Sequence, residues 1–301
     1  MKTIPFLLTC IFMAFPAFAF EVQKVTDAVY ALVGEMKQRS PANLGNNSTH
    51  GVIVTKDGVV LIDAGGSWKG AQRIHEKIRT ITDQPVKVVI NSGGQDHRWL
   101  GNGYWKSQGA EIIASRDAIE DHKERGLIML AILGNLIGDQ LDGTKPVYAE
   151  TDYEDTYSFT LGGLTFEITH AGQAHTPGDS FIWVPEKSTV FTGDIVYVER
   201  ILGISSVSHS GEWIDVFTEM AKLDATHVVP GHGHATDMEQ ATADTLNYLT
   251  NLREKLSAYM ADGGEIFESV NVDQSDFAYL KQFDSLAKRN AQQVYSELEF
   301  E

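Results

Sequence analysis

Cysteine is almost absent from this sequence. The single cysteine, Cys10, lies within the first 19 residues. If that segment is removed, the remaining chain has no thiol and forms no disulfide. Any metal ion would then have to be held by histidine and carboxylate side chains.

Basic residues are also scarce. Lys and Arg total 24 against 41 Asp and Glu, which gives a formal net charge of -17. A surface this acidic repels phosphate backbones and anionic lipids, so the sequence argues against a nucleic-acid partner. No apolar run is long enough for a transmembrane helix, and we expect no stable membrane anchor. A small-molecule substrate is the expected partner, and the oligomeric state is left open.

The first 19 residues have the pattern of a secretory signal. Met1-Lys2 is a short basic start, residues 4–15 are mostly apolar, and Ala17-Phe18-Ala19 fits a cleavage site. Thr9, which precedes Cys10, is larger than a lipoprotein signal requires. We therefore predict a signal peptide at residues 1–19 and a periplasmic or secreted protein.

Apolar patterning predicts two groups of strands, each followed by a helix. Helices are expected at 68–81 and 212–223, where apolar residues recur every three or four positions. This order predicts the α/β class with four layers, α/β/β/α. We expect one domain at 20–250 and a helical extension at 251–301 packed on it. Strands are expected at 28–33, 51–55, 59–62, 86–90, 164–169, 181–184, 189–191 and 228–229.

The most apolar internal run, residues 126–138, allows more than one interpretation. Helical spacing favours a core helix. A lid over a substrate cleft or a dimer face would show the same composition.

Polar residues that suit metal binding follow several predicted strands. Histidine nitrogens and carboxylate oxygens are the donors that a divalent ion takes from a chain without thiols. A fold that gathers them at one sheet edge would form a metal site. These residues are Asp63, Asp96, His97, His175, Asp194 and His232.

The segments around these residues resemble the metallo-β-lactamase superfamily. They occur in the family's order within residues 22–250, and they are Ile62-Asp63-Ala64-Gly65, Asp96-His97, Phe191-Thr192-Gly193-Asp194 and Val229-Pro230-Gly231-His232-Gly233. The resemblance implies the four-layer αββα fold and a metal-dependent hydrolase. The segment 290–299 is similar to the tail of exported hydrolase-like members associated with quinoprotein or sulfur-oxidation systems.

The sequence departs from the family in its signature loop, which is normally His-x-His-x-Asp-His. Ser92 and Gly94 replace the two leading histidines, so only His175 remains of the first metal site. The resemblance implies a complete second site made of Asp96, His97, Asp194 and His232. We therefore expect one Zn²⁺ per chain, although a mixed oxygen and nitrogen set also suits iron or manganese.

The resemblance also suggests roles for the remaining residues. His175 is the expected general base, with an ordinary imidazole pKa near ~6.5, or else a further metal ligand. Asp96 could share the role of base, while Asp63 and Ser92 would support the ligands without touching the metal. Because clustered carboxylates repel one another, their grouping is expected to require a bound cation.

Three functions are compatible with these residues. The first is an exported metallo-hydrolase that cleaves an amide, lactam, ester or thioester bond. The second is a non-catalytic metal-binding scaffold or partner protein with a degenerate active site. The third is an oxidoreductase or sulfur-transfer protein that uses iron.

Overall fold

The structure is a computed structural model that describes residues 20–301. The predicted signal peptide and Cys10 lie outside these residues. Within the described part of the chain, no helix is both long and apolar enough to cross a membrane.

The first sheet has seven strands in chain order. Neighbours are antiparallel from the first to the fourth strand and parallel from the fourth to the seventh. The strands are β1 (Glu21–Lys24), β2 (Val29–Val33), β3 (His50–Thr55), β4 (Gly58–Ile62), β5 (Val86–Asn91), β6 (Glu111–Ser115) and β7 (Thr151–Tyr153).

The second sheet has five strands in the order β12-β11-β10-β9-β8. Only β11 and β12 are parallel. The eight predicted strands correspond to β2 to β5 and β9 to β12 within one residue at each end. The strands of this sheet are β8 (Thr156–Leu161), β9 (Leu164–Thr169), β10 (Phe181–Val184), β11 (Thr189–Phe191) and β12 (His227–Val229).

Alternating side chains of the first sheet build two separate cores. Val60 and Ile62 of β4 face the second sheet, whereas Val59 and Leu61 pack toward α1 (Trp68–Ile78). This alternation follows from the two-residue repeat of a strand. Both faces of β4 are buried, which explains its continuous apolar sequence.

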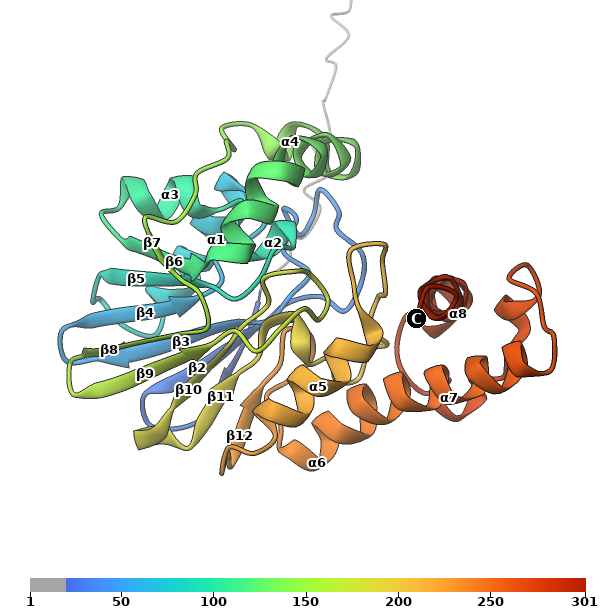
Figure 1. Ribbon diagram of the computed structural model, residues 1–301. Helices are drawn as coiled ribbons and strands as arrows, with labels where there is room; N and C mark the ends of the chain where they lie inside the picture. The colour runs from blue at the N-terminus through green and yellow to red at the C-terminus, as the bar shows by residue number, and fades with distance from the viewer. Residues whose placement is uncertain (1–19) are drawn as a thin grey trace, which may run out of the picture.

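Helices cover the outer faces of both sheets. Figure 1 shows α1 to α4 on one side of the paired sheets and α5 and α6 on the other. The predicted four-layer α/β/β/α fold is confirmed. The other helices are α2 (Asp96–Trp99), α3 (Asn102–Ser107), α4 (Arg116–Ile137), α5 (Ser210–Met220), α6 (Met238–Ala241), α7 (Asn247–Ala261) and α8 (Phe283–Leu298).

The C-terminal helices share a core with the second sheet. Trp213 of α5, Leu252 of α7 and Val294 of α8 belong to one buried cluster. The expected boundary at residue 250 falls inside α7. Residues 251–301 therefore pack on the rest of the chain through a helix that begins before that boundary.

The apolar run at 126–138 forms the second half of α4 and presents two apolar faces. Met129 and Leu133 pack against Trp99 of α2, so one face belongs to the core. Leu127 and Ile128 are 77% and 60% exposed on the other face. The core-helix interpretation therefore fits the buried face of this segment but not its exposed face.

Candidate metal centre

The candidate site lies where strands of both sheets end. Asp63 follows β4, His97 lies in α2 just after β5, Asp194 follows β11 and His232 follows β12. The pairs β4–β5 and β11–β12 are each parallel, so the strands of each pair end at the same sheet edge. This placement resembles the common location of ligand sites at the carboxyl ends of parallel strands.

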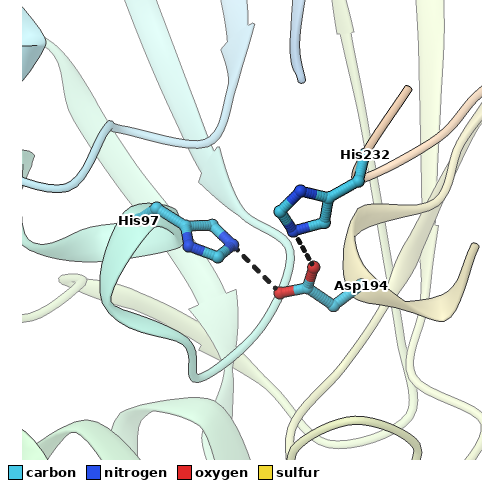
Figure 2. A group of neighbouring side chains, drawn as sticks. All are labelled: His97, Asp194 and His232. Atoms are coloured by element: carbon cyan, nitrogen blue, oxygen red, sulfur yellow. Dashed lines mark hydrogen bonds and ion pairs between the residues drawn. The ribbon is translucent and has the colours of Figure 1, made fainter. Parts of the chain in front are cut away.

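Three of the predicted ligands form one buried group. Figure 2 shows the imidazoles of His97 and His232 pointing at the carboxylate of Asp194 from two sides. His97 Nε2 lies 3.3 Å from Asp194 Oδ2, and His232 Nε2 lies 3.2 Å from Asp194 Oδ1. One ligand atom from each residue lies within 4.8 Å of the others. Two nitrogens and one oxygen match a zinc site with three protein ligands and an open position.

The far side of each imidazole faces both a hydrogen-bond acceptor and an arginine donor. His232 Nδ1 lies 2.8 Å from the Asn47 carbonyl oxygen and 2.9 Å from Arg200 Nη1, and His97 Nδ1 lies 3.2 Å from both Asp96 Oδ1 and Arg39 Nη2. When Nδ1 donates its proton to these oxygens, the Nε2 lone pair is free to bind a metal. The orientation of both rings therefore fits a metal ion beside Asp194.

Arg98 is the main feature that sequence reasoning missed. Its buried guanidinium donates to Asp194 Oδ1 and Oδ2 at 2.7 and 3.0 Å, and to Asp63 Oδ2 at 2.6 Å. Burial alone would raise the pKa of Asp194, but Arg98 and the two imidazoles hold it well below its usual range. In the sequence, the only indication that Arg98 belongs to the site was its position directly after the predicted ligand His97.

Arg98 also corrects the expectation that the clustered carboxylates require a bound cation. This side chain neutralises Asp63 and Asp194 within the protein itself. A carboxylate has about four lone-pair positions, so Asp194 can accept from Arg98 and still bind a metal. The cluster is thus compatible with a metal but does not depend on one.

Asp96 was expected to be a metal ligand, but it is not part of the group formed by His97, Asp194 and His232. Arg39 donates to Asp96 Oδ1 from Nη2 at 2.6 Å and from Nε at 3.0 Å. Burial would raise the pKa of Asp96, but the charge of Arg39 and the bond with His97 hold it well below its usual range. In this conformation Asp96 orients His97 and is outside the group of three ligands. Its pairing with Arg39 also leaves it unsuited to accept a proton.

His175, the expected base, lies apart from the three ligands. It is 8% exposed and packs near the rings of Trp213 and Tyr197, with centroids 5.5 and 6.0 Å away. Its Nδ1 atom is buried and has no hydrogen-bond partner. Burial lowers the pKa of His175 to about 4, so the expectation of an ordinary imidazole pKa is wrong. At neutral pH this side chain is an uncharged proton acceptor.

Ser92 binds Asp63 and so supports the loop that carries His97. The Ser92 backbone N–H donates to Asp63 Oδ1 at 2.8 Å, and its hydroxyl donates to Asp63 Oδ2 at 3.0 Å. Asp63 has a φ of 72°, a left-handed conformation that is uncommon for a residue other than glycine. Asp63 thus contacts both Ser92 and Arg98 at the base of the site.

The space around Gly94 is already filled. A Cβ atom at this position would lie 2.0 Å from Asp121 Oδ2. The Gly94 N–H donates to the Thr176 hydroxyl at 2.9 Å. A histidine in place of Gly94 would therefore require its neighbours to move. The packing of this loop thus suits the glycine that stands where the signature loop normally has its second histidine.

Comparison with known proteins identifies the family. A profile described as the metallo-beta-lactamase superfamily matches residues 45–232. The chain belongs to the metallo-β-lactamase superfamily. Members of this superfamily bind metal ions, usually zinc. The match covers both the signature loop and His232, and it confirms the resemblance found in the sequence.

Individual relatives of this metallo-β-lactamase superfamily member are distant. A metallo-beta-lactamase type 2 from Elizabethkingia meningoseptica is 24% identical over 221 residues, covering 68% of this chain and 76% of that protein. A linear primary-alkylsulfatase from Pseudomonas sp. (strain ATCC 19151) is 17% identical over 287 residues, covering 81% of this chain but only 54% of that enzyme. The two relatives cleave different bonds, so the family alone does not give the substrate.

Solved structures show the same fold. A metallo-beta-lactamase from Pontibacter korlensis has a TM-score of 0.63 at 21% identity, covering 77% of this chain and 99% of that chain. An inverting sec-alkylsulfatase from Pseudomonas sp. has a TM-score of 0.71 at 15% identity, covering 92% of this chain and 50% of that chain. At these identities the likeness describes the fold.

Proposed function

We propose that this protein is an exported metal-dependent hydrolase that binds one metal ion per chain. The observation that supports this most is the convergence of His97, Asp194 and His232 with both Nε2 atoms directed at one carboxylate. Zinc is the ion that best fits two imidazoles and a carboxylate, with iron or manganese as alternatives. When bound, such an ion polarises the scissile bond and lowers the pKa of water.

The chain's own residues supply positioning and proton transfer. Asp96 and the Asn47 carbonyl fix the two imidazole rings, while Arg98 fixes Asp194. His175 lines the same pocket as His97 and His232. Because its Nδ1 atom is buried away from solvent, Nε2 is the ring nitrogen that would accept a proton from the attacking water.

The bond that is cleaved remains within a small group. Amide, lactam, ester and thioester bonds all react through water attack at a polarised carbonyl carbon. Sulfate esters have no carbonyl carbon and form a separate candidate class, suggested by the linear primary-alkylsulfatase that aligns with 81% of this chain.

A non-catalytic scaffold is the second candidate, and Arg98 favours it. Because Arg98 already neutralises Asp194, packing alone could preserve the cluster. Purified protein should be assayed for metal content and then tested against a lactam, an aryl ester, a thioester and an alkyl sulfate. Metal-dependent turnover of any of these supports the hydrolase. Bound metal without turnover supports the scaffold, and absence of both would contradict each proposal.

Export to the periplasm or the medium is part of the proposal. The cleavage pattern before Phe20 supports it. Phe20 is 2% exposed and packs edge-on against His50 with ring centroids 5.5 Å apart. N-terminal sequencing of the protein from its host should begin at Phe20, whereas a cytosolic species that begins at Met1 would contradict export.

A further inference from the structure

A second group of metal-binding side chains lies where the end of α8 meets the loop before α5. His209 directly precedes α5, Glu297 lies in the last turn of α8, and Glu301 follows that helix. One ligand atom from each residue lies within 4.8 Å of the others. His209 Nδ1 is 3.4 Å from Glu297 Oε1. Ligands of a zinc ion lie about 2.0–2.2 Å from it, so an imidazole and a carboxylate this close can share one ion.

Glu297 is the buried member of this group, with a side chain that is 9% exposed. Its Oε1 atom accepts from the Ser210 hydroxyl at 2.9 Å and from the Gly211 N–H at 3.2 Å. Its Oε2 atom is buried and has no hydrogen-bond partner among the described residues. At the candidate metal centre, by contrast, Arg98 donates to both oxygens of Asp194. Burying a carboxylate oxygen without a donor or a cation is unfavourable, so Oε2 indicates a cation that the chain itself does not supply.

The charges around Glu297 also favour a cation. Arg253 of α7 donates to Glu297 Oε1 and to both oxygens of Glu301, at distances of 2.6 to 3.1 Å. These bonds lower the pKa of Glu301, and Glu297 lies close enough to act on the same carboxyl. Glu212 adds a third carboxylate, 4.0 Å from His209 Nε2. Arg253 is the one lysine or arginine of the described chain that pairs with Glu297 or Glu301, so three carboxylates share one permanent positive charge.

We propose that His209, Glu297 and Glu301 form a second cation site, separate from the candidate metal centre, that binds a divalent transition-metal ion. One imidazole and two carboxylates suit Zn²⁺ best, with Fe²⁺ and Mn²⁺ as related ions. Ca²⁺ and Mg²⁺ take oxygen ligands and fit less well. Coordination through Glu297 Oε2 would leave intact the bonds that Oε1 accepts from the start of α5.

This second site should hold its ion more weakly than the candidate metal centre. The side chains of His209 and Glu301 are 36% and 38% exposed, whereas all three ligands of the candidate metal centre are buried. His209 Nδ1 must also give up the Glu212 N–H, which donates to it at 3.1 Å. We therefore expect the ion of the second site to exchange with the buffer and to be lost on dialysis.

A cation at the second site would fasten the end of α8 to the start of α5. The loop before α5 also supports the segment that carries His175. The Ser208 hydroxyl donates to the His175 carbonyl oxygen at 2.9 Å, and the His209 N–H donates to the Ala174 carbonyl oxygen at 3.0 Å. The role of the ion would thus be structural. This inference does not depend on the proposed hydrolase, because the three ligands of the second site lie outside the pocket of the candidate metal centre.

Zinc titration tests the second site in a chain whose candidate metal centre is disabled. The mature chain carrying His232→Ala, freed of metal with a chelator, would be titrated with Zn²⁺ by calorimetry. We expect one equivalent to bind, and an excess of Ca²⁺ should not displace it. Adding Glu297→Gln should weaken this binding at least tenfold, since loss of a residue that only supports a ligand already costs about 10- to 100-fold. The amide oxygen of Glu297→Gln can still accept from Ser210 and Gly211.

His209→Asn is the second variant for this test. Asparagine is favoured at the residue before a helix, so it can still accept the Glu212 N–H while the imidazole is removed. It should weaken Zn²⁺ binding as Glu297→Gln does. Glu299→Gln is the matched control, because Glu299 is exposed between the two glutamates and is not one of the three ligands. This control should leave Zn²⁺ binding unchanged.

Hydrogen exchange locates the bound ion. In the His232→Ala chain, Zn²⁺ should slow amide exchange at the end of α8 and at the start of α5, because an ion that binds the folded state suppresses local opening. Adding Glu297→Gln should remove this protection. Should His232→Ala not fold, the same substitutions are compared in the otherwise wild-type chain, where Glu297→Gln and His209→Asn should each remove one of two equivalents.

Two results would overturn the second site. The first is the absence of saturable Zn²⁺ binding by His232→Ala, and the second is Zn²⁺ binding that neither Glu297→Gln nor His209→Asn weakens in the background used. Failure of the candidate metal centre gives a different result. A wild-type chain whose only equivalent of Zn²⁺ is lost in Glu297→Gln and kept in His232→Ala would have the second site alone.

Discussion

Arg98 and Asp194 form a fully buried ion pair in which both carboxylate oxygens are bound, at 2.7 and 3.0 Å. The same guanidinium reaches Asp63. One side chain thus links a residue that follows β4 in the first sheet to a residue that follows β11 in the second. The candidate metal centre is built on this connection.

Replacement of Arg98 should therefore destabilise the protein strongly. Arg98→Met leaves two carboxylates buried without their counterion, and breaking a buried pair in this way costs about 3–5 kcal/mol. Urea unfolding of the metal-free protein measures the effect. Arg116→Met, which removes an exposed arginine, should change the unfolding midpoint little. Equal effects of the two substitutions would show that Arg98 does not support the fold.

The sequence predicted the strands that end at the site, but not the contacts within it. Continuous β-branched runs such as Val86–Ile90 identify buried strands, and polar residues after them identify the sheet edge. Arg39 and Asp96 meet although 57 positions separate them, and Arg98 and Asp194 are 96 positions apart. A single arginine has no periodicity, so its partner becomes visible only in three dimensions.

Some missed elements were recognisable and others were not. β8 alternates polar and apolar residues, Thr156-Tyr157-Ser158-Phe159-Thr160-Leu161, which is the pattern of a half-exposed strand. β7 has only three residues and lies at the edge of its sheet. Its pairing depends on β6 more than on its own sequence.

Asp179 should make the stability of the metal-free protein depend on pH. Burial, with a further contribution from Asp194, raises the pKa of Asp179 to about 8. Between about pH 4 and pH 8 the folded state therefore holds a proton that the unfolded chain has released. The free energy of unfolding should fall as the pH rises through this window.

Asp179→Asn isolates this contribution, because an amide does not titrate. Between about pH 4 and pH 8, the free energy of unfolding of this variant should fall less than that of the wild type, as measured by urea unfolding at several pH values. Identical slopes in the wild type and the variant would show that Asp179 is ionised in the folded protein across the window.

Gly94 should tolerate no side chain. The Cβ of Gly94→Ala would overlap Asp121, whose carboxylate is paired with Arg125, and overpacking of this kind costs about 1–3 kcal/mol. Gly134→Ala is the matched control, because its Cβ would make only an ordinary contact at 3.5 Å within α4. This control should gain up to about 1 kcal/mol from helix propensity. Thermal unfolding of both variants tests the contrast, and a stable Gly94→Ala would contradict it.

The two faces of α4 should respond differently to truncation. Leu133 is fully buried, so Leu133→Ala should cost about 2–5 kcal/mol through the cavity it leaves. Leu127 is 77% exposed, and Leu127→Ala should change stability by no more than about 0.5 kcal/mol. Urea unfolding distinguishes the two. A large loss in Leu127→Ala would mean that the exposed face is covered in solution.

His232 and His175 should differ in what their removal takes away. His232 belongs to the group of three ligands, so His232→Ala should release the metal and abolish turnover together. His175 lines the pocket outside that group, so His175→Ala should keep the metal. Its rate should fall by roughly 10²-fold, the lower end for a general base, because a pKa of about 4 makes a weak proton acceptor at neutral pH. Elemental analysis and turnover, measured on the same preparations, decide between these roles. Loss of metal from His175→Ala would make His175 a ligand and would show that the ion lies closer to the pocket than the group around Asp194 indicates.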